Sequence, residues 1–158
     1  GLGLQHMQIS DPSKYDPEGK GQADLEATVA QEIINTAGLC LFKNFTGVQN
    51  IARKLIPPVT GWHFDAEEER NAGLRIFHMR HAFNLREGMK PGDFPLPKRS
   101  VGEPPQTEGP LKGVTVDYKG FNQNFFKAIG WEETTGRPSR SSLERLGGME
   151  YVIDTLGL

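Results

Sequence analysis

Apolar residues recur along most of this chain with the period of an α-helix rather than that of a strand. In the stretch 22–38, Leu25, Val29 and Ile33 fall on one face of a helix. Gly38 follows them, and a glycine in this position is a common helix stop. The spacing therefore predicts an amphipathic helix that ends at Gly38.

A shorter helix is expected after Gly47, because Val48, Ile51, Ala52 and Leu55 share one face. The pair of prolines at 57–58 lacks the backbone N–H groups that continue a helix. We therefore expect this second helix to stop at the prolines.

The clearest helical pattern runs from Asp65 to Gly88. Asp65 is a good N-cap residue, and Glu68 stands three positions later as a capping-box partner. Two adjoining apolar rows follow, one of Leu74, Phe77 and His81 and one of Ala72, Ile76, Met79 and Phe83.

No period is visible from Met89 to about Tyr118, where prolines are frequent. Helical spacing returns in 121–130, in 139–148, where a serine cap and a Gly-Gly stop are expected, and in 149–156. The sequence thus predicts an all-α fold, an irregular helical domain with a long proline-rich loop and little or no sheet. Residues 1–21 are expected to form a loop or linker, and 22–158 the helical domain.

The composition excludes several classes of function. The 158 residues carry a formal net charge of −2, so there is no basic field to gather nucleic acid or coat an anionic membrane. No apolar run approaches the roughly 18 residues of a membrane span, and the first residues do not resemble a secretory signal. A single cysteine excludes an internal disulfide and favours a reducing compartment, so we expect a cytoplasmic protein.

Cys40, in the stretch NTAGLCLF, is the one thiol of the chain. It could be a buried small apolar residue, a nucleophile, or one ligand of a metal site completed elsewhere. The nucleophile reading, a stand-alone hydrolase, needs a base, and none of the four histidines is set against Cys40 by the sequence. An iron–sulfur cluster normally takes four thiolates, so this chain alone could not hold one.

Other polar residues have ordinary explanations beside functional ones. His78 and His81 are spaced to share a metal on one helical face, but arginines flank them, and surface or core histidines are the simpler reading. Asn84, Arg86 and Glu87 form either a buried polar network or an exposed ion pair, and the composition does not choose.

Four stretches taken in order resemble one family. They are NTAGLCLF, VTGWHFDAEEERNAGLRIFHMRHAFNLREG, FPLPKRSVGEPPQTEGPLKG and GWEETTGRPSRSSLERLGG. Their order and spacing resemble the carboxyl-terminal part of the tungsten-containing aldehyde ferredoxin oxidoreductases, from about Gly19 to the end of the chain.

The resemblance implies roles for the segment that contains the cysteine. In the family, a Gly-Leu-Cys step supplies the fourth ligand of a [4Fe–4S] cluster, and Gly38, Leu39 and Cys40 match it. An aspartate five residues before that cysteine receives hydrogen bonds from the pterin of the tungsten cofactor. Here that position is Asn35, an amide that can accept a hydrogen bond but lacks the negative charge and adds a donor.

The resemblance also implies a function for a longer enzyme. That enzyme would hold tungsten, or molybdenum, on two pterins, oxidise an aldehyde to a carboxylate, and pass electrons through the cluster to ferredoxin. This chain would be inactive alone, its partner would be the amino-terminal part of the same enzyme, and an oligomer is compatible with the sequence. We also expect an exposed apolar patch where the other domains dock. The alternative from another class is a cofactor-free helical interaction module descended from the family.

Overall fold

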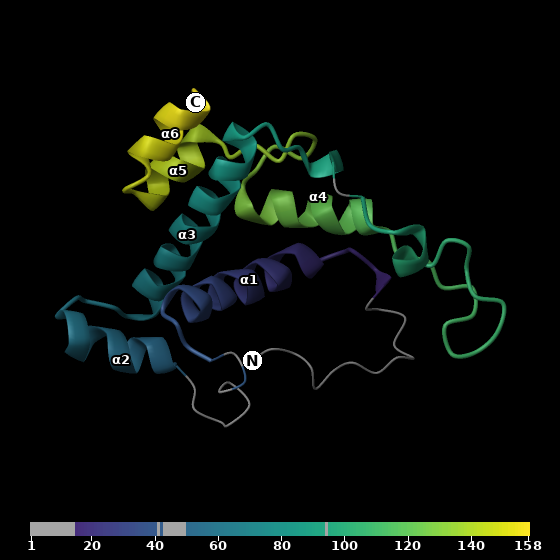
Figure 1. Ribbon diagram of the computed structural model, residues 1–158, viewed down its shortest axis with the longest axis horizontal. Coiled ribbons are helices and arrows are strands. Elements are labelled where there is room, and N and C mark those ends of the chain that lie inside the picture. Colours follow the sequence, from purple (N-terminus) through teal and green to yellow (C-terminus); the bar gives the residue numbers. More distant parts are fainter. Residues whose placement is uncertain (1–14, 41, 43–49, 94) are drawn as a thin grey trace. The chain divides into compact units, whose positions relative to one another are not determined.

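The computed structural model describes residues 15–40, 42, 50–93 and 95–158. Its α-helices are shown in Figure 1 and are α1 (Lys20–Thr36), α2 (Ile51–Thr60), α3 (Ala66–Arg86), α4 (Tyr118–Ile129), α5 (Arg140–Leu146) and α6 (Glu150–Leu156). Two short 3-10 helices, η4 (Pro91–Asp93) and η5 (Lys98–Val101), lie in the proline-rich stretch. Over the described ranges there is no strand, and the β-structure consists of isolated bridge residues, among them Gln106 and Lys112. The prediction of an all-α fold is confirmed.

The chain divides into two compact units, with the boundary inside α1 between Leu25 and Glu26. Of the described residues, the first unit comprises 26–40, 42, 50–88 and 138–158, and the second comprises 15–25, 89–93 and 95–137.

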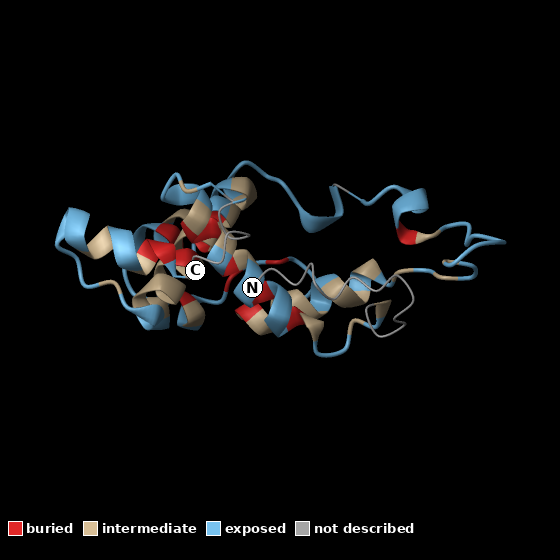
Figure 2. Cartoon of the chain, turned by 90° about the horizontal axis from the view of Figure 1, so that it is seen from below, coloured by how far each residue is buried: buried red, intermediate tan, exposed pale blue. Residues whose placement is uncertain are grey.

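The core of the first unit forms where α3, α5 and α6 meet (Figure 2). Its buried side chains are apolar, and half-buried leucines pack around them, so the short helices α5 and α6 are held mainly by this packing. The buried members are Ala82, Leu143, Met149, Val152, Ile153 and Leu156.

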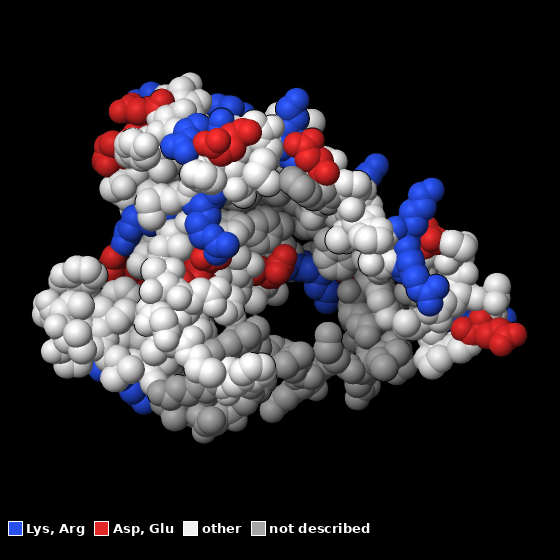
Figure 3. Space-filling view, in the orientation of Figure 1, with Lys and Arg blue, Asp and Glu red and all other residues white. Residues whose placement is uncertain are grey.

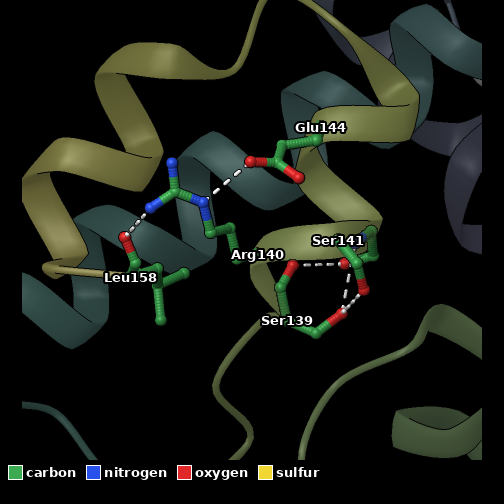
Figure 4. Close-up of polar contacts among 6 residues, drawn as sticks. Ser139, Arg140, Ser141, Glu144 and Leu158 are labelled. Atoms are coloured by element: carbon green, nitrogen blue, oxygen red, sulfur yellow. Dashed lines mark hydrogen bonds and ion pairs between the residues drawn. The ribbon is translucent and has the colours of Figure 1, made fainter.

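Polar contacts at the ends of α5 complete this packing (Figure 4). The Ser139 hydroxyl accepts a hydrogen bond from the Ser142 N–H at 3.2 Å, which confirms the expected serine cap. Arg140 donates to the Glu144 carboxylate at 2.7 Å and to the Leu158 carbonyl oxygen at 2.8 Å, and so joins α5 to the last residue.

In the second unit, backbone contacts order the long proline-rich loop. The Val116 N–H donates to the Val101 carbonyl at 2.9 Å. Gly102, with φ of 76°, lies so close to this strand-like segment that a Cβ would come within 2.4 Å of the Val114 carbonyl oxygen. Phe125 and Phe126, both in α4, pack on the Trp131 ring just after the helix. Their ring centroids lie 6.1 and 5.7 Å, respectively, from that of Trp131.

Helix α2 does not stop at the prolines, so that prediction is wrong. Pro57 and Pro58 lie inside the helix, which continues to Thr60. The proline φ fits a helix, and each ring removes one hydrogen bond without preventing another turn. The end is made by Gly61, at φ of 75°, whose N–H donates to the Pro57 carbonyl at 2.8 Å. Val48 lies outside the described residues, Ile51 and Ala52 are buried as expected, and Leu55 is exposed.

Helix α3 starts as predicted, because the Asp65 carboxylate accepts from the Glu68 N–H at 2.9 Å. Hydrogen bonds from that N–H and from His63 hold the pKa of Asp65 below its usual value. The Glu68 side chain contacts Arg75 and not the Asp65 N–H, so the N-cap is as predicted but the capping-box partner is wrong among the described residues. The Arg75 guanidinium also donates to the Leu146 carbonyl. The buried positions of α3 are Gly73, His78 and Ala82, and none of them belongs to the two apolar rows of the predicted pattern.

Charged side chains of both signs are interspersed over α3, α5 and α6 on the face shown in Figure 3. This distribution agrees with the small net charge of −2. Across the described part of the chain, none of the helices has the length and apolar character needed to cross a membrane.

Candidate cofactor site at the end of helix α1

Helix α1 ends in a Schellman motif that carries the predicted site residues. Gly38 has φ of 66°, in the left-handed region. The Leu39 N–H donates to the Ile34 carbonyl at 2.9 Å, and the Gly38 N–H donates to the Asn35 carbonyl at 3.2 Å. These are the two hydrogen bonds that define the motif, so the predicted stop at Gly38 is confirmed.

Cys40 follows this motif directly, and its side chain is exposed. The reading of Cys40 as a buried apolar residue is therefore wrong for this structure. Leu39 beside it is half-buried. An exposed thiol after a rigid turn is accessible to a metal centre or to a reagent.

Asn35 is exposed and lies five residues before Cys40. Its side-chain oxygen accepts a hydrogen bond from the Gln31 side-chain amide at 2.8 Å. The amide nitrogen of Asn35 is a donor that an aspartate would not offer. The structure thus brings Asn35, Gly38, Leu39 and Cys40 together in one turn, as their closeness in sequence requires.

Three contacts along one face of α1 join it to α3 in the first unit. Glu26 pairs with Arg70 at 2.9 Å. At the next turn, the backbone of Val29 packs against Gly73, where an added Cβ would lie 2.6 Å from the Val29 carbonyl oxygen. At the turn after that, Glu32 accepts from Arg80.

The Glu32–Arg80 pair was missed by sequence reasoning. Both Glu32 oxygens accept from Arg80 Nη1, at 2.5 and 2.7 Å, and the Glu32 side chain is only 8% exposed. A glutamate directly before the buried Ile33 was the available signal, since the positions beside an apolar row are shielded by the neighbouring helix.

The histidines of α3 do not form a metal site with other ligands. His78 is 2% exposed, and burial, followed by the charge of His81, lowers the pKa of His78 to about 4. Across residues 15–40, 42, 50–93 and 95–158, no group of three or more His, Cys, Asp or Glu side chains could hold a metal ion. A cluster or metal bound through Cys40 would need ligands from outside these ranges.

The polar residues at the end of α3 form an exposed ion pair. Arg86 donates to Glu87 at 2.9 Å, with the two side chains 44% and 51% exposed. The Arg86 guanidinium also lies 4.8 Å from the centroid of the Phe83 ring. The alternative of a buried network at Asn84, Arg86 and Glu87 is not what this structure contains.

Large apolar side chains are exposed on two helices of the first unit, as expected for a surface that another polypeptide covers. On α2 and just after it they lie one turn apart, in a region of Figure 3 with few charges, and on α3 they form one row. These residues are Leu55 and Val59 on α2, Trp62 just after it, and Met79 and Phe83 on α3.

Comparison with known proteins identifies the family of this chain. The family model described as aldehyde ferredoxin oxidoreductase, domains 2 and 3, matches residues 3–147. A tungsten-containing aldehyde ferredoxin oxidoreductase of Pyrococcus furiosus is 35% identical over 145 residues, which cover 89% of this chain and 24% of that protein. The enzyme of the same name from Thermococcus kodakarensis is 34% identical over 146 residues, with the same two shares. The chain therefore spans about a quarter of the length of the curated relatives that it matches, and it belongs to the aldehyde ferredoxin oxidoreductase family, in the region of domains 2 and 3.

Proposed function

We propose that this chain is the carboxyl-terminal helical part of a tungsten-pterin, iron–sulfur oxidoreductase, and that Cys40 is one ligand of its [4Fe–4S] cluster. The observation that carries the proposal is the exposed thiol of Cys40 directly after the Schellman turn at Gly38, in a chain of this family. Such a cluster takes four thiolates, so the donor set here fits one corner of it and needs three more cysteines from a segment outside this chain.

The residues around Cys40 would act by position and hydrogen bonding. Gly38 sets the chain reversal that presents the thiol, and half-buried Leu39 anchors the turn. Asn35 would face the pterin with an amide in place of a carboxylate. Hydrogen bonds to the cluster sulfurs would tune its reduction potential.

The complete enzyme would oxidise an aldehyde to a carboxylate, with tungsten or molybdenum on two pterins supplying the redox chemistry. Ferredoxin would accept the electrons, and the small aldehyde or carboxylate substrate would bind mainly to parts outside this chain. The chain alone would be inactive. The exposed side chains of Val59, Trp62 and Phe83 would be covered by the amino-terminal part of the enzyme, in the cytoplasm.

The gene context gives a direct test. We expect the natural reading frame to encode three cysteines upstream in a C-x-x-C-x-x-x-C arrangement. Their absence would remove the cluster and would favour the alternative function, a cofactor-free helical interaction module. The hydrogen bond from Gln31 that already occupies the Asn35 oxygen is the observation on the side of that alternative.

A second test uses the full-length protein with Cys40→Ser. We expect loss of iron and of the electron paramagnetic resonance (EPR) signal of the reduced cluster, since a serine oxygen is a poorer cluster ligand than a thiolate. Ser141→Ala, at an exposed position of α5, is the matched control and should keep both. Full iron content and an unchanged signal in Cys40→Ser would refute the ligand role.

A further inference from the structure

We infer that the Glu32–Arg80 ion pair positions the Asn35–Cys40 turn, and that Arg80 is a positioning residue for the cluster thiolate. The inference rests on the proposed function, because that function makes Cys40 a cluster ligand. The structural observations behind it are the contacts between α1 and α3.

The Glu32–Arg80 pair is unusual because its carboxylate is buried. The Glu32 carboxylate is 8% exposed, whereas the Arg80 side chain that binds it is 64% exposed. Burying a carboxylate carries a large desolvation cost unless it is paired and hydrogen-bonded. Here one guanidinium nitrogen donates to both oxygens, at 2.5 and 2.7 Å, so Arg80 is what allows Glu32 to stay inside.

The pair also lies close to the site. Glu32 is one helical turn before Asn35 on α1, and residues one turn apart share a helix face. Toward the start of α1, the backbone contact between Val29 and Gly73 already fixes the two helices together. Beyond that contact, the Glu32–Arg80 pair holds the last turn of α1 against α3.

The chain contains a matched control in Glu26 and Arg70. This pair joins the same two helices at 2.9 Å, but its side chains are 46% and 41% exposed. An exposed pair contributes little because water screens it, and it can be lost without leaving a buried charge. Arg70 lies on the far side of the Val29–Gly73 contact from Cys40, so its loss should leave the turn in place.

Without Arg80, Glu32 would have to move toward water, because its buried carboxylate would be unpaired. Such a movement pulls on the last turn of α1 and displaces the Cys40 sulfur, which follows eight residues later. A displaced thiolate alters the hydrogen bonds and geometry at one iron of the cluster.

The test compares Arg80→Ala, Arg80→Lys and Arg70→Ala in the full-length protein. In Arg80→Ala we expect shifted g values of the reduced cluster and exchange of backbone amide hydrogens at 33–39 faster by about tenfold or more. Exchange in α5 and α6 should stay within about twofold of the parent, which shows that the change is local. Arg80→Lys should restore most of both readouts, and Arg70→Ala should match the parent.

Equal effects of Arg80→Ala and Arg70→Ala, or no change at 33–39, would overturn the inference. If Arg80→Ala does not fold, Arg80→Met tests the same pair, because it keeps the apolar stem and removes the charge and donors that satisfy the buried Glu32 carboxylate; parental exchange at 33–39 in that variant would also overturn it. Failure of the proposed function is distinguishable, since a cluster that survives Cys40→Ser refutes the ligand role and leaves the exchange comparison valid.

Discussion

The backbone of Val29 in α1 lies so close to Gly73 of α3 that a methyl group at position 73 would come within 2.6 Å of the Val29 carbonyl oxygen. Two helices can approach this closely only where one of them lacks a side chain. The contact fixes α1 against α3 at the middle of the row that Glu26 and Glu32 also join.

Gly73→Ala should therefore destabilise the protein, although alanine is the better helix former. We expect a loss of about 1–3 kcal/mol, because the overlap is with backbone atoms that cannot rotate away. Urea unfolding followed by circular dichroism measures it. Gly92→Ala is the control, since an added Cβ there meets nothing within 4 Å; equal stability of the two variants would contradict the close approach.

Gly38→Ala should weaken the end of α1 through its backbone conformation alone. Space around Gly38 is open, so the expected cost of about 1 kcal/mol comes from the left-handed φ of 66°. Gly38→Asn should cost less, because asparagine tolerates this region better. Thermal unfolding of the two variants tests the order, and a more stable alanine variant would show that the turn is not left-handed in solution.

His78 should make stability fall at mildly acidic pH. Burial lowers the pKa of folded His78 from 6.5 to about 4, so between these values the unfolded chain binds the additional proton. Stability is then unaffected by His78 above about pH 6.5 and decreases as the pH falls toward 4, by up to about 3 kcal/mol.

Chemical unfolding at several pH values between 4 and 8 measures this slope. In His78→Gln the slope should flatten, whatever the change in stability at neutral pH. His63→Gln should retain it, because the His63 side chain is 83% exposed. A parental slope in His78→Gln would assign the effect to other groups.

Asn35→Asp should introduce an unfavourable charge at the end of α1. Position 35 lies in the last turn, where the helix dipole is negative, and no basic residue of that turn offsets it. We expect a loss of roughly 0.3–1 kcal/mol at low salt that largely disappears near 1 M salt. Equal stability at low salt would mean that the Gln31 side chain, which donates to position 35, compensates the charge.

Much of the fold could be predicted from the sequence because its signals are local. The apolar row of Leu25, Val29 and Ile33 is buried, and Gly38 ends its helix. Asp65 and Ser139 cap their helices through their own side chains. Each of these features depends on residues within one or two turns of each other.

Sequence reasoning missed one local feature, the end of α2, and two features that depend on contacts between distant segments. The end of α2 depends on Thr60 and Gly61, whose hydrogen bonds outweigh the two prolines: Thr60 donates to the Ile56 carbonyl at 2.8 Å and Gly61 to that of Pro57. Burial of His78 and Glu32 depends on which face of α3 meets its neighbours, and a helical pattern with two adjoining apolar rows does not define that face.

The candidate site was predicted as a set of residues, and its geometry follows from the turn that contains them. The exposure of Cys40 could not be predicted, because a cysteine after a helix is more often buried. The ligand role of Cys40 and the pterin contact of Asn35 stay predictions until the experiments above are made.

The reversal at Gly38 is made by main-chain groups alone, through the Ile34 and Asn35 carbonyls. The path of the backbone in this turn therefore does not depend on the side chains that would face a cofactor. The exposed side chains at 35 and 40 can be exchanged during evolution while the loop keeps its path, and a relative can alter the charge next to a cofactor without refolding the segment that reaches it.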